Sequence, residues 1–147
     1  MVDVSEKKVT HREAVAEGEI RINPKVIEQI KSWKIAKGNV LETARLAGIM
    51  AAKKVDQLIP LCHSVPLEGI RLEFNVKSDR ILIQSTVRCS GKTGVEMEAL
   101  TAVAVAGLTL YDMCKAVDKN MTVGPFVLMK KSGGRSGGYV RQGGYPT

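Results

Sequence analysis

The residue types suited to acid–base chemistry lie at the two ends of one predicted helix. Glu96 and Glu98 stand at its start, and Asp112 and Lys115 stand near its end. Two carboxylates on one wall of a cavity repel each other, which raises the pKa of at least one of them and makes a proton donor near neutral pH. A lysine held by an aspartate can neutralise a phosphate or move a proton. The sequence therefore indicates acid–base chemistry on an anionic substrate, built on a rigid element.

Structural roles also explain the two glutamates. Thr93 and Glu96 fit a capping box, Thr-x-x-Glu, which satisfies backbone donors at a helix start. Residues two apart lie roughly 200° apart around a helix. Glu96 and Glu98 can therefore face one cavity only if residues 94–98 are extended. Spacing leaves both interpretations open.

The lysine and histidine candidates have structural alternatives as well. Asp112 and Lys115 are spaced as an ordinary surface ion pair, whereas a catalytic role would require burial to lower the pKa of Lys115. Lys37 comes just before a predicted helix, where backbone N–H groups favour anions, although solubility also explains an exposed lysine. His63 lies in an apolar loop and is either a structural residue or a proton shuttle. No metal site is indicated, because His11 is remote from His63 and the three cysteines are scattered along the chain.

Length and composition favour one small domain that binds an anion. The chain has 147 residues, 44% of them hydrophobic, and a net charge of +7. It shows neither a signal peptide nor a run of about 18 apolar residues, so we expect a cytoplasmic protein. Cys62, Cys89 and Cys114 form no C-x-x-C pair, which predicts free thiols. The positive charge suits a nucleotide, a nucleic acid or a phosphorylated metabolite.

Apolar periodicity predicts an α+β domain. In chain order we predict a strand over residues 9–22, a helix that starts at Pro24, a helix over 40–52, a loop over 58–66, a hairpin of strands over 70–76 and 80–89, a helix over 97–116 and a strand over 121–130. The first helix would carry an apolar stripe of Val26, Ile27, Ile30 and Trp33. This order predicts one largely antiparallel sheet with helices packed on one face.

The end of the chain is rich in glycine and basic residues. Residues 135–147 cannot bury enough apolar surface to be ordered without a partner, so we predict a mobile tail after a single domain of residues 1–134. Lys130, Lys131 and Arg135 resemble basic tails that bind nucleic acid nonspecifically. Aromatic residues make up only 4% of the chain, so stacking platforms for single strands are missing. A basic nucleotide- or nucleic-acid-binding module without catalysis is therefore the alternative function.

Several blocks of the sequence closely resemble the family of cyclic pyranopterin monophosphate synthases, the accessory protein C of molybdenum cofactor biosynthesis. The matching blocks are residues 1–5 (MVDVS), 37–38 (KG), 43–49 (TARLAGI), 58–63 (LIPLCH), 91–102 (GKTGVEMEALTA), 110–117 (LYDMCKAV) and 131–134 (KSGG). Their order along the chain argues against chance agreement. Ser64 departs from the pattern, because many relatives have proline there.

The resemblance implies a lyase that converts 3′,8-cyclo-7,8-dihydro-GTP to cyclic pyranopterin monophosphate and releases pyrophosphate. It also implies a ferredoxin-like α+β fold and a homohexamer, built as a trimer of dimers, with the active site at a subunit interface. The substrate would come from a radical S-adenosylmethionine enzyme acting on GTP. Catalysis would use no metal or redox cofactor, and neither nucleic acid nor a membrane would be a partner.

The same resemblance assigns roles to individual residues. The catalytic residues would be Asp112, Lys115 and Lys37. Substrate contacts would come from two segments and one further lysine: Leu61, Cys62, His63, Glu96, Met97, Glu98 and Lys131. In the mechanism that this implies, the lysines neutralise the triphosphate and move protons with help from His63, while Asp112 positions Lys115.

Overall fold

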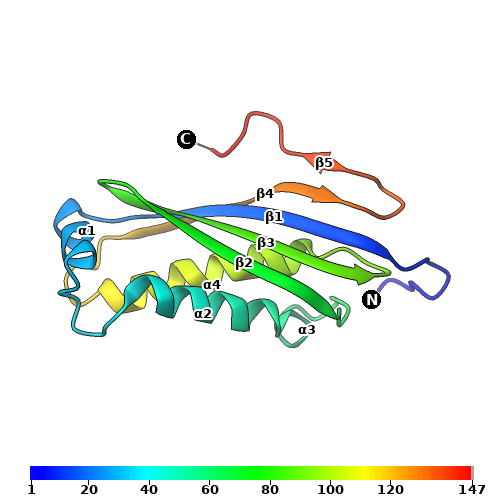
Figure 1. The fold of residues 1–147 in the computed structure, drawn as a ribbon, viewed down its shortest axis with the longest axis horizontal. Helices are drawn as coiled ribbons and strands as arrows, with labels where there is room; N and C mark the ends of the chain where they lie inside the picture. The colour runs from blue at the N-terminus through cyan, green and yellow to red at the C-terminus, as the bar shows by residue number, and fades with distance from the viewer. Residues whose placement is uncertain (147) are drawn as a thin grey trace.

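The computed structural model describes residues 1–146 and consists of a sheet with helices on one of its faces (Figure 1). In chain order the elements are β1 (Thr10–Arg21), α1 (Pro24–Lys31), α2 (Val40–Ala52), α3 (Val55–Leu58), β2 (Leu67–Val76), β3 (Arg80–Gly91), α4 (Glu96–Cys114), β4 (Thr122–Ser132) and β5 (Tyr139–Val140). The strands pair in the order β2-β3-β1-β4-β5, and every neighbouring pair is antiparallel. Up to β4, the chain follows the β-α-β-β-α-β connectivity of the ferredoxin-like fold, which confirms the predicted fold class.

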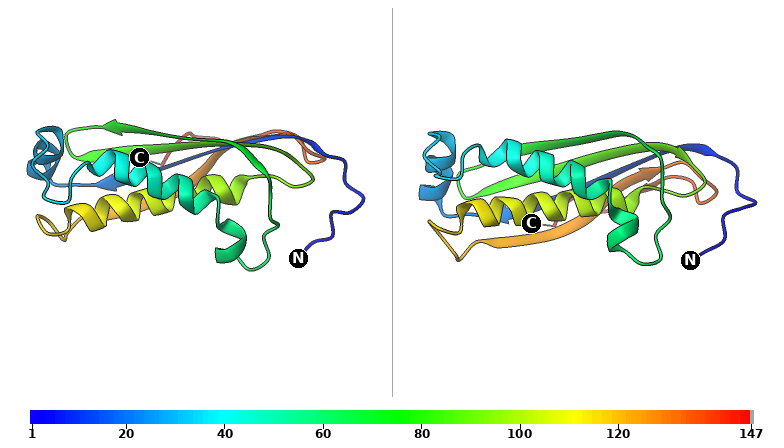
Figure 2. Two further views of the ribbon diagram at one scale, coloured as in Figure 1. Left: turned by 60° about the horizontal axis from the view of Figure 1, so that its bottom comes forward. Right: turned by 90° about the horizontal axis from the view of Figure 1, so that it is seen from below.

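Small residues let α4 approach both of its neighbours closely. A Cβ atom at Gly18 of β1 would lie 2.5 Å from Val103 Cγ1. A Cβ atom at Gly48 of α2 would lie 2.7 Å from the backbone oxygen of Ala102. Glycine at both positions therefore allows α4 to lie against the sheet and beside α2, as Figure 2 shows.

The apolar character of α4 is explained by core packing. By length and composition α4 would also pass as a membrane-crossing helix. However, Ala99, Ala102, Val103, Ala106 and Leu110 are fully buried in the core that α4 forms with the sheet and α2. α4 is thus a rigid core element whose two ends are held by their surroundings.

Trp33 does not belong to the apolar stripe of α1, which corrects the sequence interpretation. α1 ends at Lys31, and Trp33 is 74% exposed with a φ of 59°. The amide of Lys34 donates to the carbonyl oxygen of Gln29 at 2.9 Å, and the amide of Trp33 donates to that of Ile30 at 3.2 Å. These two bonds form the Schellman arrangement of a helix C-terminus. Trp33 therefore occupies the position at which glycine is preferred.

Replacing Trp33 with glycine is expected to stabilise the protein by about 1 kcal/mol. The left-handed backbone conformation costs a residue with a Cβ atom roughly 1–2 kcal/mol. Glycine avoids this cost, but it loses more conformational entropy on folding, which offsets part of the gain. For a chain of this size the Tm should rise by about 2–4 °C. Thermal unfolding followed by circular dichroism measures the change. Trp33→Ala is the control, since it removes the indole and keeps the Cβ atom. A glycine variant no more stable than the alanine variant would refute the strain argument.

The sequence patterns do not predict two short elements, α3 and β5. The predicted loop over residues 58–66 is preceded by the single helical turn α3. The C-terminal segment contains β5, which pairs with β4 through Lys130 and Val140 and through Lys131 and Tyr139. The mobility of residues 135–147 stays a prediction, as does the catalytic domain of residues 1–134, and Thr147 lies outside the described residues.

Candidate active site

The three predicted catalytic residues meet at one end of the helix layer. Asp112 lies in the last turn of α4, Lys115 directly follows that helix, and Lys37 comes from the loop between α1 and α2. Lys37 Nζ lies 2.7 Å from Asp112 Oδ2, and Lys115 Nζ lies 2.7 Å from Asp112 Oδ1. Lys37 Nζ also donates to the backbone oxygen of Asp112 at 3.0 Å, near a helix end where carbonyl groups need partners. We call these three residues the lysine–aspartate cluster.

The contacts within the lysine–aspartate cluster set its charge. Hydrogen bonds from Lys115 and Lys37 lower the pKa of Asp112 to about 2, and the bond to Asp112 raises the pKa of Lys115. The side chain of Lys115 is 50% exposed, so the idea that burial lowers its pKa is wrong. At neutral pH, Asp112 is a carboxylate between two ammonium groups. The cluster therefore carries excess positive charge, which suits a phosphate.

Replacing Asp112 with asparagine is expected to lower the pKa of Lys115, because the carboxylate of Asp112 is the main cause of its upward shift. In the variant, activity should fall off at a lower pH on the basic side of the pH–rate profile, which kcat/KM measured from neutral to strongly basic pH will detect. Asp118→Asn is the control, since Asp118 lies shortly after the same end of α4 and its carboxylate accepts a bond from the amide of Asn120. If the basic side of the pH–rate profile is the same in Asp112→Asn as in the wild type, the carboxylate of Asp112 does not control the pKa of Lys115.

A second group of predicted residues lines one cavity of about 310 Å³ at the other end of α4. We call it the glutamate–histidine pocket; its predicted residues are Leu61, Cys62, His63, Glu96, Met97 and Glu98. The N-terminal segment closes one side, and His63 Nε2 lies 2.8 Å from the backbone oxygen of Val2. Because a carbonyl oxygen only accepts hydrogen bonds, Nε2 carries the proton in this contact.

Burial controls protonation inside the glutamate–histidine pocket. Glu98 is only 5% exposed, and burial raises its pKa, with the charge of Glu96 adding to the shift. The predicted upward shift of one carboxyl pKa is therefore confirmed, although burial rather than repulsion is its main cause. Burial also raises the pKa of the Cys62 thiol, with Glu98 as the second cause. Glu98 is thus the candidate proton donor, and Cys62 stays a neutral thiol.

The start of α4 differs from both sequence-based alternatives. The helix begins at Glu96, with Val95 as its cap and no capping bond from a side chain, so the capping box of Thr93 and Glu96 is wrong. An extended segment over residues 94–98 is wrong as well, because Glu96 and Glu98 both lie in the first turn. They still reach one cavity, because the carboxylate of Glu96 folds back into the space that a Cβ atom at Gly94 would fill.

Lys131 lies apart from both groups, on β4. It pairs with Ala14 of β1, and its Nζ donates to Ser136 Oγ in the turn after β4. Thr10 of β1 pairs with Gly91 at the end of β3, so Lys131 lies toward the end of the sheet from which the chain enters α4. It is not among the residues that line the glutamate–histidine pocket.

Arg12 is a buried charge that the sequence analysis passed over. It is 8% exposed, and its guanidinium donates to the backbone oxygens of Gly91 and Lys92 at 3.3 Å each. These bonds hold the turn that leads into α4. The available signal was strand parity, because Arg12 falls on the same side of β1 as the buried Ala14 and Ala16.

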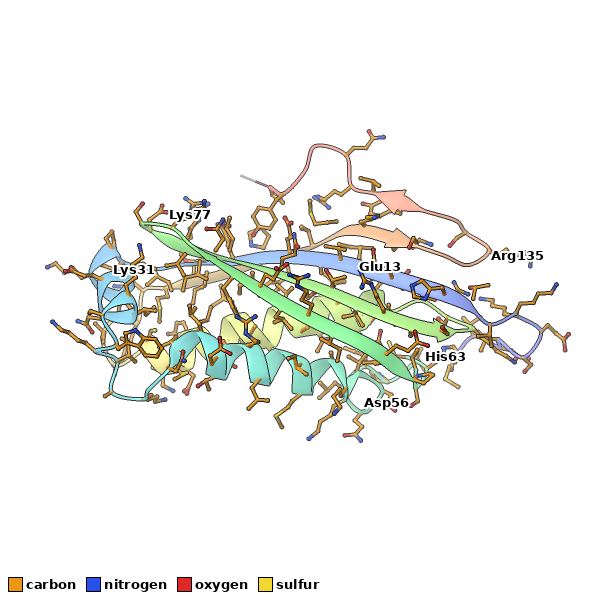
Figure 3. All side chains as sticks on the ribbon, viewed as in Figure 1. Glu13, Lys31, Asp56, His63, Lys77 and Arg135 are labelled. Atoms are coloured by element: carbon orange, nitrogen blue, oxygen red, sulfur yellow. The ribbon has the colours of Figure 1, made fainter. Side chains whose placement is uncertain are left out.

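α4 keeps the lysine–aspartate cluster and the glutamate–histidine pocket apart within one chain. The helix has 19 residues, which corresponds to about 28 Å at 1.5 Å per residue. In Figure 3, His63 lies toward one end of the molecule and Lys31 of α1 lies at the other. Proton transfer needs heavy atoms within about 3 Å of each other. One chain therefore does not bring both groups to the same reacting atom.

Fold and site together describe a ferredoxin-like acid–base enzyme with charged groups at both ends of its core helix. The MoaC family profile matches residues 1–134, and the chain belongs to this family. A cyclic pyranopterin monophosphate synthase of Magnetococcus marinus is 57% identical over 143 residues, covering 96% of this chain and 88% of the relative. Proteins of the same name from Brevibacillus brevis and Heliobacterium modesticaldum are 55% and 54% identical, covering 96% and 97% of this chain and 89% and 91% of the relatives.

Proposed function

We propose that this protein is a lyase that converts 3′,8-cyclo-7,8-dihydro-GTP to cyclic pyranopterin monophosphate and pyrophosphate. The relatives named above are synthases of that product and align with nearly the whole chain. The observation that carries the proposal is the lysine–aspartate cluster, because two ammonium groups around one carboxylate match a triphosphate. A binding module without catalysis is not favoured, since those relatives are named as enzymes.

In this mechanism the two lysines act on the phosphates. Lys37 and Lys115 neutralise the triphosphate and stabilise the charge that develops on the leaving pyrophosphate while the cyclic phosphate forms. Asp112 holds both amines in place, and its carboxylate keeps Lys115 protonated. Lys115 therefore begins the reaction as a charge and a proton donor.

The glutamate–histidine pocket acts on the ring system in the same mechanism. Glu98, with its raised pKa, donates a proton as the purine-derived ring opens, and His63 moves protons as the ring recloses as a pterin. Opening and reclosing the ring breaks and forms carbon–nitrogen bonds, and these side chains supply the proton transfers that assist those steps. In our proposal, side chains of this protein also stabilise the charge of the phosphate displacement, and no cofactor takes part.

A second copy of the chain completes the site in our proposal. Along the outer stripe of α4, Met97 of the pocket and Asp112 of the cluster are separated by Leu108, which is 58% exposed. On the neighbouring α2, Leu46 and Met50 are exposed too. Exposed apolar side chains that gather on one face mark an interaction surface. Their position between the two half-sites favours a second copy as the occupant.

The expected dimer has two-fold symmetry with antiparallel helix layers. In that arrangement the start of one α4 faces the end of the other, so the glutamate–histidine pocket of one copy joins the lysine–aspartate cluster of its partner. A two-fold axis repeats the contact and makes two complete sites. Three such dimers would form the homohexamer that the family resemblance implies.

We further propose that the protein works in the cytoplasm and receives its substrate from a radical S-adenosylmethionine enzyme acting on GTP. Free thiols at Cys62, Cys89 and Cys114 agree with a reducing compartment. A nucleotide with a new carbon–carbon bond between ribose and base is a product that radical chemistry can supply.

Turnover of the purified protein tests the function directly. Given the cyclised GTP derivative, the protein should release pyrophosphate and form cyclic pyranopterin monophosphate in equal amounts, detected as its fluorescent oxidised pterin. A boiled sample and a sample given GTP itself are the controls. Folded protein that consumes no substrate in this assay would overturn the proposal.

A further inference from the structure

Residues 135–146 lie beyond the match to the family profile, yet several contacts join them to β4. β5 pairs with Lys130 and Lys131 of β4. The amide of Arg141 donates to the backbone oxygen of Met129 at 2.8 Å, and the Tyr145 hydroxyl donates to that of Pro125 at 2.9 Å. We call residues 135–146 the C-terminal strap.

Glycines allow the strap to turn back onto β4. Gly133, Gly134 and Gly137 all have positive φ values, between 67° and 91°, which residues with a Cβ atom rarely adopt. A Cβ atom at Gly134 would also collide with the guanidinium of Arg12. In the sequence these glycines favour the prediction of a mobile tail, whereas in the structure they form a tight turn that packs on the buried Arg12.

The strap changes the surroundings of Lys131. Ala14 of β1 flanks Lys131 on one side and Tyr139 of β5 flanks it on the other, so without β5 this lysine would lie on an edge strand. Its Nζ donates to Ser136 Oγ, a neutral acceptor, and it forms no ion pair with a carboxylate of residues 1–146. Lys130 differs, because its Nζ lies 3.8 Å from the carboxylate of Glu13. Of these two lysines, the strap contacts the one that has no acidic partner in the described part of the chain.

We propose that the C-terminal strap positions Lys131 to bind the phosphates of the substrate, with Ser136 and Tyr139 as the positioning residues. The inference depends on the proposed function, in which Lys131 contacts the substrate. A lysine loses much rotamer freedom when it binds an anion. A strap that restricts Lys131 beforehand reduces this loss, so it should improve substrate binding and leave the chemical step unchanged.

Two substitutions in the full-length chain test the strap. Tyr139→Pro removes an amide from the pairing beside Lys131, and Ser136→Ala removes the acceptor for Nζ. Gln142→Pro is the matched control, since it places the same residue in the strap outside β5. We expect KM to rise about tenfold for Tyr139→Pro and about threefold for Ser136→Ala, because the free energy of ordering one side chain corresponds to changes in affinity of roughly this size. The kcat of both variants should stay within about twofold of wild type. The control should match the wild type.

A double-mutant cycle separates positioning of Lys131 from other effects. In the Lys131→Ala background, Tyr139→Pro should not raise KM further. An equal increase in both backgrounds, or a folded Tyr139 variant with unchanged or lower KM, would overturn the proposal. Binding of inorganic pyrophosphate, measured by calorimetry, should weaken in parallel with KM. Because this readout needs no turnover, it tests the strap even if the lyase assay fails, and equal pyrophosphate affinity in wild type and Tyr139→Pro would also overturn it.

Discussion

Replacing Lys115 with alanine is expected to lower kcat/KM by about 10²–10⁴-fold, because the substitution removes a charge that stabilises the leaving pyrophosphate and a group that donates a proton. We expect the protein to stay folded, since the side chain is half exposed and, within residues 1–146, its ammonium group pairs with Asp112 alone. Steady-state kinetics with the cyclised GTP derivative measures the loss, and circular dichroism checks the fold.

Two further substitutions sharpen the test of Lys115. Lys115→Arg keeps the positive charge but scarcely releases a proton, so partial activity in this variant would assign part of the effect to charge alone. Lys119→Ala removes an exposed lysine at the same end of the molecule and should leave kcat/KM unchanged. Full activity of a folded Lys115→Ala protein would remove the role assigned to the lysine–aspartate cluster.

Replacing Glu98 with glutamine should lower kcat by about 10²–10⁴-fold, because the amide fills the same space without a proton to donate. The same change should stabilise the protein at neutral pH. Burial raises the pKa of Glu98, so its contribution to stability is complete below the pKa of an unfolded glutamate and is lost as the pH rises through the higher native pKa. Glutamine does not ionise, so the Glu98→Gln variant does not lose this stability as the pH rises.

Scanning calorimetry from acidic to neutral pH can follow that stability difference. The Tm of Glu98→Gln should exceed that of the wild type at neutral pH, and the difference should shrink as the pH falls. Glu28→Gln is the control, because Glu28 is an exposed residue of α1. A Glu98 variant that is both active and no more stable than the wild type at neutral pH would show that this carboxyl group is neither the proton donor nor destabilised by burial.

Local patterns predicted the layers of the fold because each pattern had a single physical cause. Polar and apolar residues alternate in β1 and in the hairpin, and this alternation indicates one buried face. Asn23 before Pro24 indicates a helix start, where the side chain of Asn23 accepts a hydrogen bond from the amide of Lys25. Trp33 was misplaced because helical spacing continues beyond the last helical residue. β5 was missed because two residues between glycines carry no periodicity.

The candidate site could be predicted only as two lists of residues. Lys37 and Asp112 are 75 positions apart, and only the packing of α2 against α4 brings the α1–α2 loop to the end of α4. The sequence suggested a lowered pKa for Lys115, but protonation depends on exposure and on the partner actually reached, which spacing does not specify. The distance between the two half-sites likewise follows from the length of α4, a core helix of 19 residues.

Subunit complementation tests most directly whether two chains share one site. Lys115→Ala and Glu98→Gln each disable a different half-site, so each variant alone should be inactive. Mixed in equal amounts and allowed to exchange subunits, the two variants should recover about a quarter of wild-type activity, because half of the dimers are mixed and each mixed dimer has one intact site of two. No recovery, with mixed oligomers demonstrated by native mass spectrometry, would contradict a site assembled from the pocket of one chain and the cluster of another.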